Sequence, residues 1–226
     1  MKKKIVVFAP HPDDETWGCG GSIAKKISEG FEVIVVIMTD GRYAFSEIFG
    51  INSDPTPEEL KEIRKEEVIR STKILGVPRE NLTFLDFRDG SLEEYEEEAK
   101  EKIIEILKEH LPVEIYFPYK KDCHPDHRVT CRIVQNSLQR LELTGMRYQY
   151  SILRNHSRIG PLIDKMRDIF KKSMIDVDIS EFLHVKEQAA KEFKSEISII
   201  SSRQERPLTE KLDSYLKDKE TFYVEK

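Results

Sequence analysis

The sequence predicts an α/β fold: a doubly wound, Rossmann-like three-layer sandwich with a mostly parallel central sheet and helices on both faces. Two observations predict it. Short β-branched runs at 5–9 and 33–38 do not alternate with polar residues, as expected for strands that are buried on both faces. Segments of helical character separate these runs from each other and from further short apolar runs.

The expected elements alternate in order through the first 143 residues. The helix at 57–75 has the clearest start, because Thr56 can cap it and Pro57 suits its first position. Gly30 is a natural end for the first helix. The expected strands are Ile5–Ala9, Val33–Met38, Leu82–Leu85 and Val113–Phe117, and the expected helices are Gly21–Glu29, Pro57–Leu75, Leu92–Glu109 and His127–Leu143.

The C-terminal third has weaker patterns. Two further strands are expected at Tyr148–Leu153 and Phe222–Val224, and two further helices at Glu181–Ser201 and Thr209–Lys219. The segment 154–173 is ambiguous, with Gly160 and Pro161 marking a turn. No repeat or linker divides the chain, so we expect one domain over residues 1–226, with a more divergent, helical part at 154–226.

Composition excludes several classes of protein. The 226 residues are 38% apolar and 35% charged, with 37 basic against 42 acidic side chains and a net charge of −5. This acidic balance disfavours nucleic acid as a partner. The longest clean apolar run, 33–38, is far shorter than the roughly 18 residues of a membrane-spanning helix, so we expect no membrane partner.

The cysteines and the N-terminus predict a cytoplasmic protein. Three cysteines without a Cys-x-x-Cys motif do not form a disulfide framework, which fits a reducing compartment. The apolar run at 5–9 is too short for a signal peptide and is cut by Pro10. Abundant Lys and Glu with few Asn and Gln indicate a thermophilic source, where homo-oligomers are common.

Two His-Pro-Asp clusters carry the chemistry. Residues 11–15 read His-Pro-Asp-Asp-Glu directly after the first expected strand, and residues 124–127 read His-Pro-Asp-His shortly after the fourth. Ligands of open α/β sheets bind at the carboxyl ends of the strands. We therefore expect the two clusters to face each other across one cleft.

A single His-Pro-Asp can also be a simple turn, because Pro and Asp favour turns and helix starts. The tripeptide occurs twice, each time after a buried strand, which weakens that interpretation. Two imidazoles, one carboxylate and an open position for water make a catalytic zinc site. A second carboxylate nearby can act as the general base. A further histidine can stabilise or protonate the reacting groups of the substrate.

Other motifs favour structural roles. The glycines at 18, 20 and 21 lack the spacing of a dinucleotide-binding loop, so we expect a tight turn and close helix packing there. Asp40 follows the second expected strand, where it can line the cleft or cap a turn. His156 lies in the ambiguous segment and is a weaker candidate for contact with substrate.

The chain resembles the PIG-L/LmbE-like zinc-dependent N-deacetylases. The resemblance is carried by Ala9-Pro10-His11-Pro12-Asp13-Asp14-Glu15 with Gly18-Cys19-Gly20-Gly21, and by the second motif at 124–127. Weaker matches run through nearly the whole chain, most strongly over 5–135. They are Thr39-Asp40-Gly41, Arg64 with Glu67, Leu75-Gly76-Val77, the block at 84–90, and Lys186 with Ala189, Ala190 and Ser195.

This resemblance implies a role for each matched residue. His11, Asp14 and His127 would bind one Zn²⁺, although the same ligands also accommodate other divalent metals. Asp13 would be the general base, and His124 would stabilise the oxyanion. The remaining implied roles are Asp126 as the partner that orients His124 and Arg64 as a substrate-binding residue, with Asp40 as a second expected substrate contact.

The implied activity is hydrolysis of a linear amide, with removal of an N-acetyl group from an N-acetylglucosamine-type sugar. Two alternatives stay open. One is an amidase on another linear amide, such as a thiol conjugate, and the other is a catalytically silent sugar- or metal-binding module. Three positions depart from the family pattern: Asp122 stands where some members have tyrosine, Glu196 stands where the pattern has glutamine, and 154–175 fits poorly.

Overall fold

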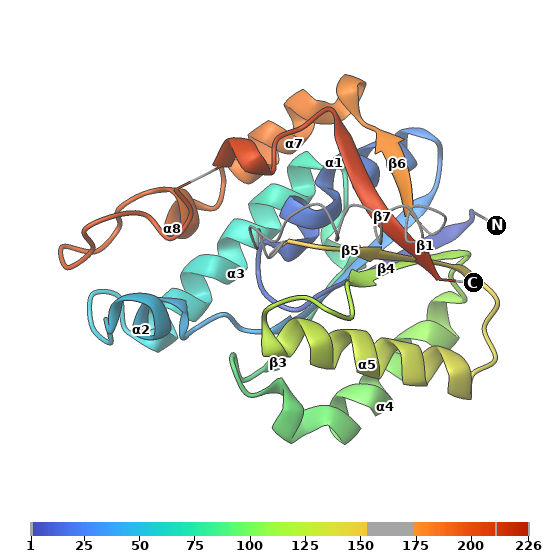
Figure 1. The fold of residues 1–226 in the computed structure, drawn as a ribbon, viewed down its shortest axis with the longest axis horizontal. Helices are drawn as coiled ribbons and strands as arrows, with labels where there is room; N and C mark the ends of the chain where they lie inside the picture. The colour runs from blue at the N-terminus through green and yellow to red at the C-terminus, as the bar shows by residue number, and fades with distance from the viewer. Residues whose placement is uncertain (1, 153–173, 211, 226) are drawn as a thin grey trace, which may run out of the picture.

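The computed structural model describes residues 2–152, 174–210 and 212–225. In this part of the chain seven strands form one mixed sheet with the order β3-β2-β1-β4-β5-β7-β6 (Figure 1). The strands β1 to β5 run parallel, and β7 and β6 add an antiparallel extension. Their bounds are β1 Lys4–Ala9, β2 Glu32–Thr39, β3 Leu82–Phe87, β4 Glu114–Pro118, β5 Met146–Tyr150, β6 Met174–Asp178 and β7 Lys219–Glu225.

The strand order reverses beside β1. The chain moves outward from β1 through β2 to β3, and then returns to place β4 on the other side of β1. In doubly wound sheets the crevice at such a switch point is where ligands bind. The carboxyl ends of β1 and β4 are therefore the favoured place for a site.

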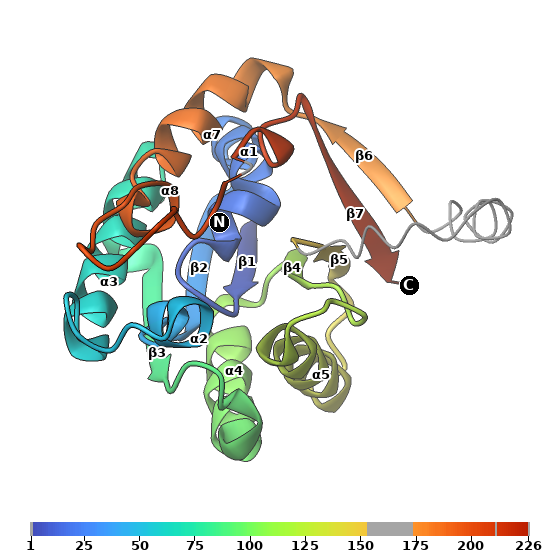
Figure 2. The same ribbon diagram turned by 60° about the vertical axis from the view of Figure 1, so that its left-hand side comes forward.

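Helices cover both faces of the sheet (Figure 2). Helices α1, α3 and α7 pack together on one face, and α4 and α5 pack together on the other. The bounds are α1 Asp14–Ser28, α2 Ala44–Phe49, α3 Pro57–Ile74, α4 Glu96–His110, α5 Pro125–Arg140, α7 Leu183–Ala190 and α8 Lys194–Ile197. The predicted three-layer α/β architecture with a mostly parallel sheet is confirmed.

Alternate residues of the central strands bury their side chains in different layers. Ile5 and Val7 of β1 belong to the apolar cluster under α1, whereas Val6 and Phe8 belong to the cluster under α4 and α5. All four side chains are at most 1% exposed. This two-sided burial explains why the strand sequence shows no polar alternation.

Several boundaries differ from the prediction. The fifth strand lies at 146–150 instead of 148–153, and the segment 181–201 contains a 3-10 turn, α7 and α8 in place of one helix. The predicted helix at 209–219 is wrong, because its described residues hold only a 3-10 turn at 212–214 and the first residue of β7. In its described residues the C-terminal part, expected to be helical with a strand at 222–224, contains α7 and α8 together with the strands β6 and β7.

Helix α1 begins seven residues earlier than predicted, because its glycines belong to the helix. The helix is kinked at Cys19, where φ is −150°. A Cβ on Gly18 would lie 2.4 Å from the ring of Tyr150, and one on Gly21 would lie 2.2 Å from Ile179. The predicted close helix packing is present, whereas the predicted turn is not.

Replacing Gly21 by alanine is expected to lower the free energy of unfolding by about 1–3 kcal/mol, because the added methyl overpacks the contact with Ile179. Gly20→Ala is the matched control, since its Cβ would lie 3.3 Å from Lys186. Urea unfolding of both variants measures the difference. Equal stability of the two variants would show that the close approach of Ile179 carries no cost.

A buried ion pair between α7 and β7 holds the middle of α1. Lys186 Nζ lies 2.6 Å from Glu220 Oε1 and donates to the carbonyl of Trp17 over 2.9 Å. The Glu220 carboxylate in turn accepts from the backbone N–H groups of Gly21 and Ser22. These contacts use groups that the kink removes from the helical pattern.

In the described residues no helix is both long and apolar enough to cross a bilayer.

Candidate metal centre

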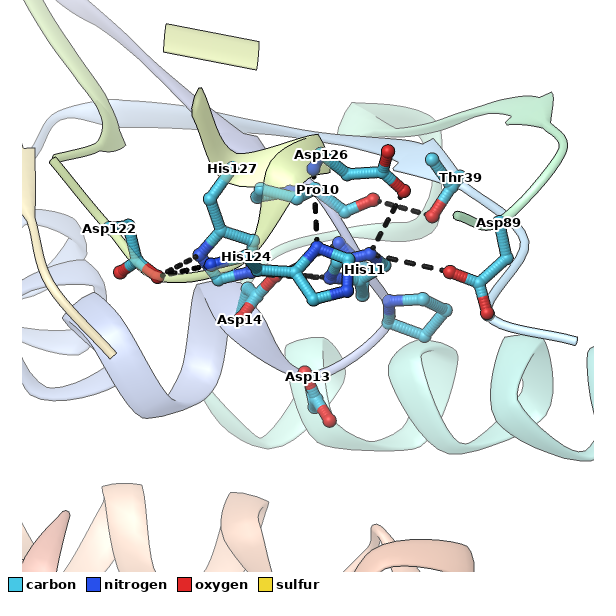
Figure 3. A network of polar contacts seen from close by, with 12 residues as sticks. Pro10, His11, Asp13, Asp14, Thr39, Asp89, Asp122, His124, Asp126 and His127 are labelled. Carbon is cyan, nitrogen blue, oxygen red and sulfur yellow. Dashed lines mark hydrogen bonds and ion pairs between the residues drawn. The ribbon is translucent and has the colours of Figure 1, made fainter. Parts of the chain in front are cut away.

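The two His-Pro-Asp clusters meet at the switch point. His11 lies two residues after the end of β1, and His124 is the N-cap of α5, in the connection that follows β4. Pro125 occupies the first turn of α5, which places His127 one turn further along the same helix. Figure 3 shows the imidazoles of His11, His124 and His127 gathered in one cluster.

Three of these side chains present one atom each to a common point. His11 Nδ1 lies 3.2 Å from Asp14 Oδ2, His127 Nε2 lies 3.1 Å from the same oxygen, and the two nitrogens are 3.3 Å apart. Ligands of a tetrahedral zinc ion with bonds of about 2.0–2.1 Å lie roughly 3.3 Å from each other. The chemistry and the spacing of this His–Asp–His triangle therefore fit one face of a metal shell.

Carboxylates orient both imidazoles of the triangle from behind. His11 Nε2 lies 3.3 Å from Asp126 and 3.3 Å from Asp89, and His127 Nδ1 lies 3.3 Å from Asp122 (Figure 3). Metal-binding histidines commonly hold their second ring nitrogen against a carboxylate in this way, which fixes the tautomer. The arrangement is a second argument that the triangle is a metal site.

Buried charges around the triangle shift its pKa values in opposite directions. Burial alone lowers the pKa of His11 and His127, but hydrogen bonds and charges of their carboxylate partners raise the pKa of His11 well above its usual value and that of His127 to about 9. Burial raises the pKa of Asp14, and the two imidazoles more than reverse this, so that it lies well below its usual range. Hydrogen bonds and charge therefore couple the three side chains of the triangle.

Two other donor groups overlap with this triangle. His11, His124 and His127 form one, and His11, Asp89 and Asp126 form the other. We favour the His–Asp–His triangle, because Asp126 already accepts from the backbone N–H groups of Gly90 and Leu92 and so acts as a fixed partner of His11.

Asp13 is held apart from the imidazoles. Its carboxylate accepts from Arg64 Nη2 over 2.9 Å, and Figure 3 shows it on the opposite side of His11 from Asp126. Its backbone has φ of 128°, a conformation that costs L-residues about 1–3 kcal/mol and often marks functional sites. Burial and the charge of Glu196 raise the pKa of Asp13, although Arg64 acts against them. Asp13 therefore has the raised basicity that a general base needs.

His124 has a different partner from the one predicted. Its Nδ1 accepts the backbone N–H of Asp126 over 3.2 Å, whereas the Asp126 carboxylate lies against His11. The prediction that this carboxylate orients His124 is thus not supported, because the helix start at Pro125 turns the Asp126 side chain toward β1. Burial, followed by the charges of His11 and His127, lowers the pKa of His124 to about 4.

The two expected substrate contacts are placed differently by the structure. Arg64 is only 4% exposed and lines the pocket, but its guanidinium is engaged with Asp13, Glu196 and backbone carbonyls. Asp40 accepts a hydrogen bond from Arg42 Nε over 2.7 Å, and it does not line the pocket. A substrate-binding role for Asp40 stays a prediction without support from this geometry.

A pocket of about 410 Å³ opens over the triangle. Its floor contains His11, Asp14 and His127, and its walls come from α2, from the segment 206–210 and from Tyr215. The segment is attached to the site through Glu196, whose carboxylate and carbonyl both accept from Thr209. This is enough room for a sugar-sized ligand.

His156, the weaker candidate for contact with substrate, lies outside the described residues.

Sequence reasoning missed three functional side chains. Asp89 follows β3, so the rule of strand carboxyl ends that found the other clusters could have found it. Asp122 was noted only as a departure, and Glu196 only as a replaced glutamine. Their contacts with His127 and Arg64 depend on the course of the loop after β4 and of α8, which no local pattern shows.

Replacing Asp122 by asparagine is expected to weaken metal binding by about 10- to 100-fold, because the orienting carboxylate behind His127 loses its charge. Competition with a chelator of known affinity measures the change. Asp176→Asn on the exposed edge strand β6 is the matched control. Unchanged affinity in the Asp122 variant would show that His127 needs no orienting partner.

The fold and site together define the class of this protein: a doubly wound α/β protein with a candidate metal centre at its switch point. Residues 6–138 match the PIG-L family, described as GlcNAc-PI de-N-acetylase, and the chain belongs to this family.

Individual relatives agree with the family match. The chain is 33% identical over 129 residues to diacetylchitobiose deacetylase from Thermococcus kodakarensis, which covers 56% of this chain and 45% of that protein. It is 31% identical over 143 residues to a probable N-acetyl-alpha-D-glucosaminyl L-malate deacetylase 2 from Bacillus cereus, with coverages of 62% and 63%. The matches thus span from just under half to just under two thirds of these relatives.

A solved structure agrees with the observed fold. The N,N'-diacetylchitobiose deacetylase from Pyrococcus horikoshii superposes with a TM-score of 0.70 over 99% of this chain and 84% of that chain, at 24% identity. At this identity the likeness supports the fold alone. It extends the agreement beyond the family match at 6–138 into the C-terminal part of the chain.

Proposed function

We propose that this protein is a zinc-dependent hydrolase that removes the N-acetyl group from an N-acetylglucosamine-type sugar. The observation that carries the proposal is the triangle of His11, Asp14 and His127, with atoms 3.1–3.3 Å apart and a carboxylate behind each imidazole. The named activities of the two deacetylase relatives favour an acetylated amino sugar as substrate.

The triangle would hold the metal, which supplies Lewis acidity for the amide carbonyl and makes a water molecule more acidic. Asp13 lies in the same pocket and takes the proton of the attacking water. Arg64 keeps the Asp13 carboxylate in place from the wall of the pocket. The strained backbone of Asp13 lets the two adjacent carboxylates point in different directions, that of Asp13 to Arg64 and that of Asp14 to the two imidazoles.

His124 acts on the carbonyl oxygen of the substrate. Because its Nδ1 accepts a backbone N–H, the neutral ring carries its proton on Nε2 and can donate a hydrogen bond. Such a donor stabilises the negative charge that develops on the oxygen. A neutral His124 has no proton to spare, so protonated Asp13 delivers the proton to the leaving amine. The products are acetate and a free amino sugar.

The test combines metal content with free-amine release. We expect about one zinc per chain by elemental analysis, and amine release from N-acetylglucosamine or its disaccharide that stops with a chelator and returns with zinc. Metal without amine release from any acetylated sugar would overturn the deacetylase proposal. It would favour an amidase on another linear amide, such as a thiol conjugate, or a silent binding module.

A further inference from the structure

The charged side chains that line the pocket are mostly acidic. In the described part of the chain six carboxylates line it against two guanidinium groups. With every one of these groups ionised and a divalent cation at the triangle, negative charge would exceed positive by two in the described lining. The lining carboxylates are those of Asp13, Asp14, Glu47, Asp89, Glu196 and Glu210.

The two guanidinium groups in the described lining each lie beside carboxylates. Arg64 Nη2 lies 2.9 Å from Asp13 and 2.8 Å from Glu196, so two carboxylates share one cation. Arg206 is half-exposed at the rim, 3.7 Å from Glu210. In the described lining the charge of Arg64 is therefore exceeded by the two acids beside it, and Arg206 has one acid as a loose partner.

Glu47 adds an unmatched charge at the rim. It lies on the short helix α2, is exposed, and forms no ion pair within residues 2–152, 174–210 and 212–225. Burial and the charges of Asp89 and Asp126 raise the pKa of Glu47, whereas the charge of His11 lowers it. A second negative group carried by a ligand would enter a region that already repels it.

We propose that the pocket selects amino sugars without anionic substituents, and that Glu47 is a specificity-determining residue that disfavours carboxylate-bearing ones. This inference rests on the proposed deacetylase function and names its substrate class. The acetyl group of a neutral sugar reaches the triangle without electrostatic repulsion. A dicarboxylate attached to the same sugar is repelled by the negative charge at the rim of the pocket.

The test compares two substrates of nearly the same shape, N-acetylglucosaminyl malate and its dimethyl ester, with di-N-acetylchitobiose as a neutral reference. We expect kcat/KM of the native enzyme to be at least about tenfold higher for the diester than for the diacid. The variant Glu47→Lys reverses one charge, and this is expected to narrow the ratio by roughly tenfold, as Coulomb energies at ~10 Å in water imply for two carboxylates.

Glu105→Lys is the matched control, because Glu105 is an exposed residue of α4, outside the pocket lining, and the variant changes the net charge equally. It is expected to leave the diester-to-diacid ratio unchanged. A diacid that is hydrolysed as fast as the diester, or equal shifts in both variants, would overturn the inference. No amine release from any of the three compounds would instead contradict the proposed function itself.

Discussion

Asp14→Ala is expected to remove the metal and to reduce amine release by roughly a thousandfold or more. Asp14 Oδ2 is the one oxygen that lies within 3.2 Å of both ring nitrogens of the triangle, and it is buried. Its loss leaves two imidazoles, fewer than the three protein ligands of a catalytic zinc site. A metal ion contributes several kcal/mol to such a reaction, and each ~1.4 kcal/mol is a factor of ten.

Elemental analysis and a chelator competition measure the metal, and the amine assay measures turnover. Asp176→Ala, on the exposed edge strand β6, controls for the loss of one carboxylate elsewhere. Circular dichroism checks that the Asp14 variant is folded. Asp14 is one of the carboxylates that raise the pKa values of His11 and His127, so its removal takes away a negative charge that compensates two buried imidazoles. Full metal content in a folded Asp14→Ala protein would refute the assignment of the triangle.

The central sheet could be predicted because its strands are buried on both faces. Val6 and Val7 lie in different apolar layers, and both layers demand apolar side chains, so the strand is visible as an unbroken run. Helix α3 was predicted for a different reason: Thr56 and Pro57 mark its start, and in the structure Thr56 forms a capping box with Glu59 there. In both elements local sequence and tertiary environment favour the same structure.

The C-terminal strands could not be predicted on the same basis. Strand β6 is an edge strand in which Ile175 and Asp176 are exposed, so no buried pattern marks it. The segment 209–219 has the polar and apolar spacing of an amphipathic helix. Among its described residues, however, Thr209, Glu210 and Tyr215 line the pocket and Lys219 begins β7. Tertiary contacts outweigh local propensity here.

The candidate site shows the same division. Motif positions at strand ends predict that the two clusters share one site, and the family resemblance implies His11, Asp14 and His127 as its ligand set. The structure brings these three residues together. Which carboxylate stands behind which imidazole depends on side-chain directions at the start of α5. Asp126 points to His11 and Asp122 to His127, a pairing that spacing in the sequence does not determine.

Asp13→Asn is expected to lower kcat by about 10²–10⁴-fold while the metal content stays near that of the native protein. The amide oxygen of asparagine can still accept from Arg64, so the local packing is retained, but the group can no longer take a proton from water. Because the triangle does not include Asp13, its three donor atoms stay in place. The change separates proton transfer from metal binding.

Steady-state kinetics with elemental analysis on the same sample measure both effects. Asp178→Asn, an exposed residue at the end of β6, is the matched control for loss of one carboxylate charge. A fall in kcat with little change in KM is expected, because the proton transfer occurs in the reaction and substrate binding precedes it. If the Asp13 variant keeps native turnover, another group takes the proton, and Glu196, which lines the same pocket and shares Arg64, is the next carboxylate to replace.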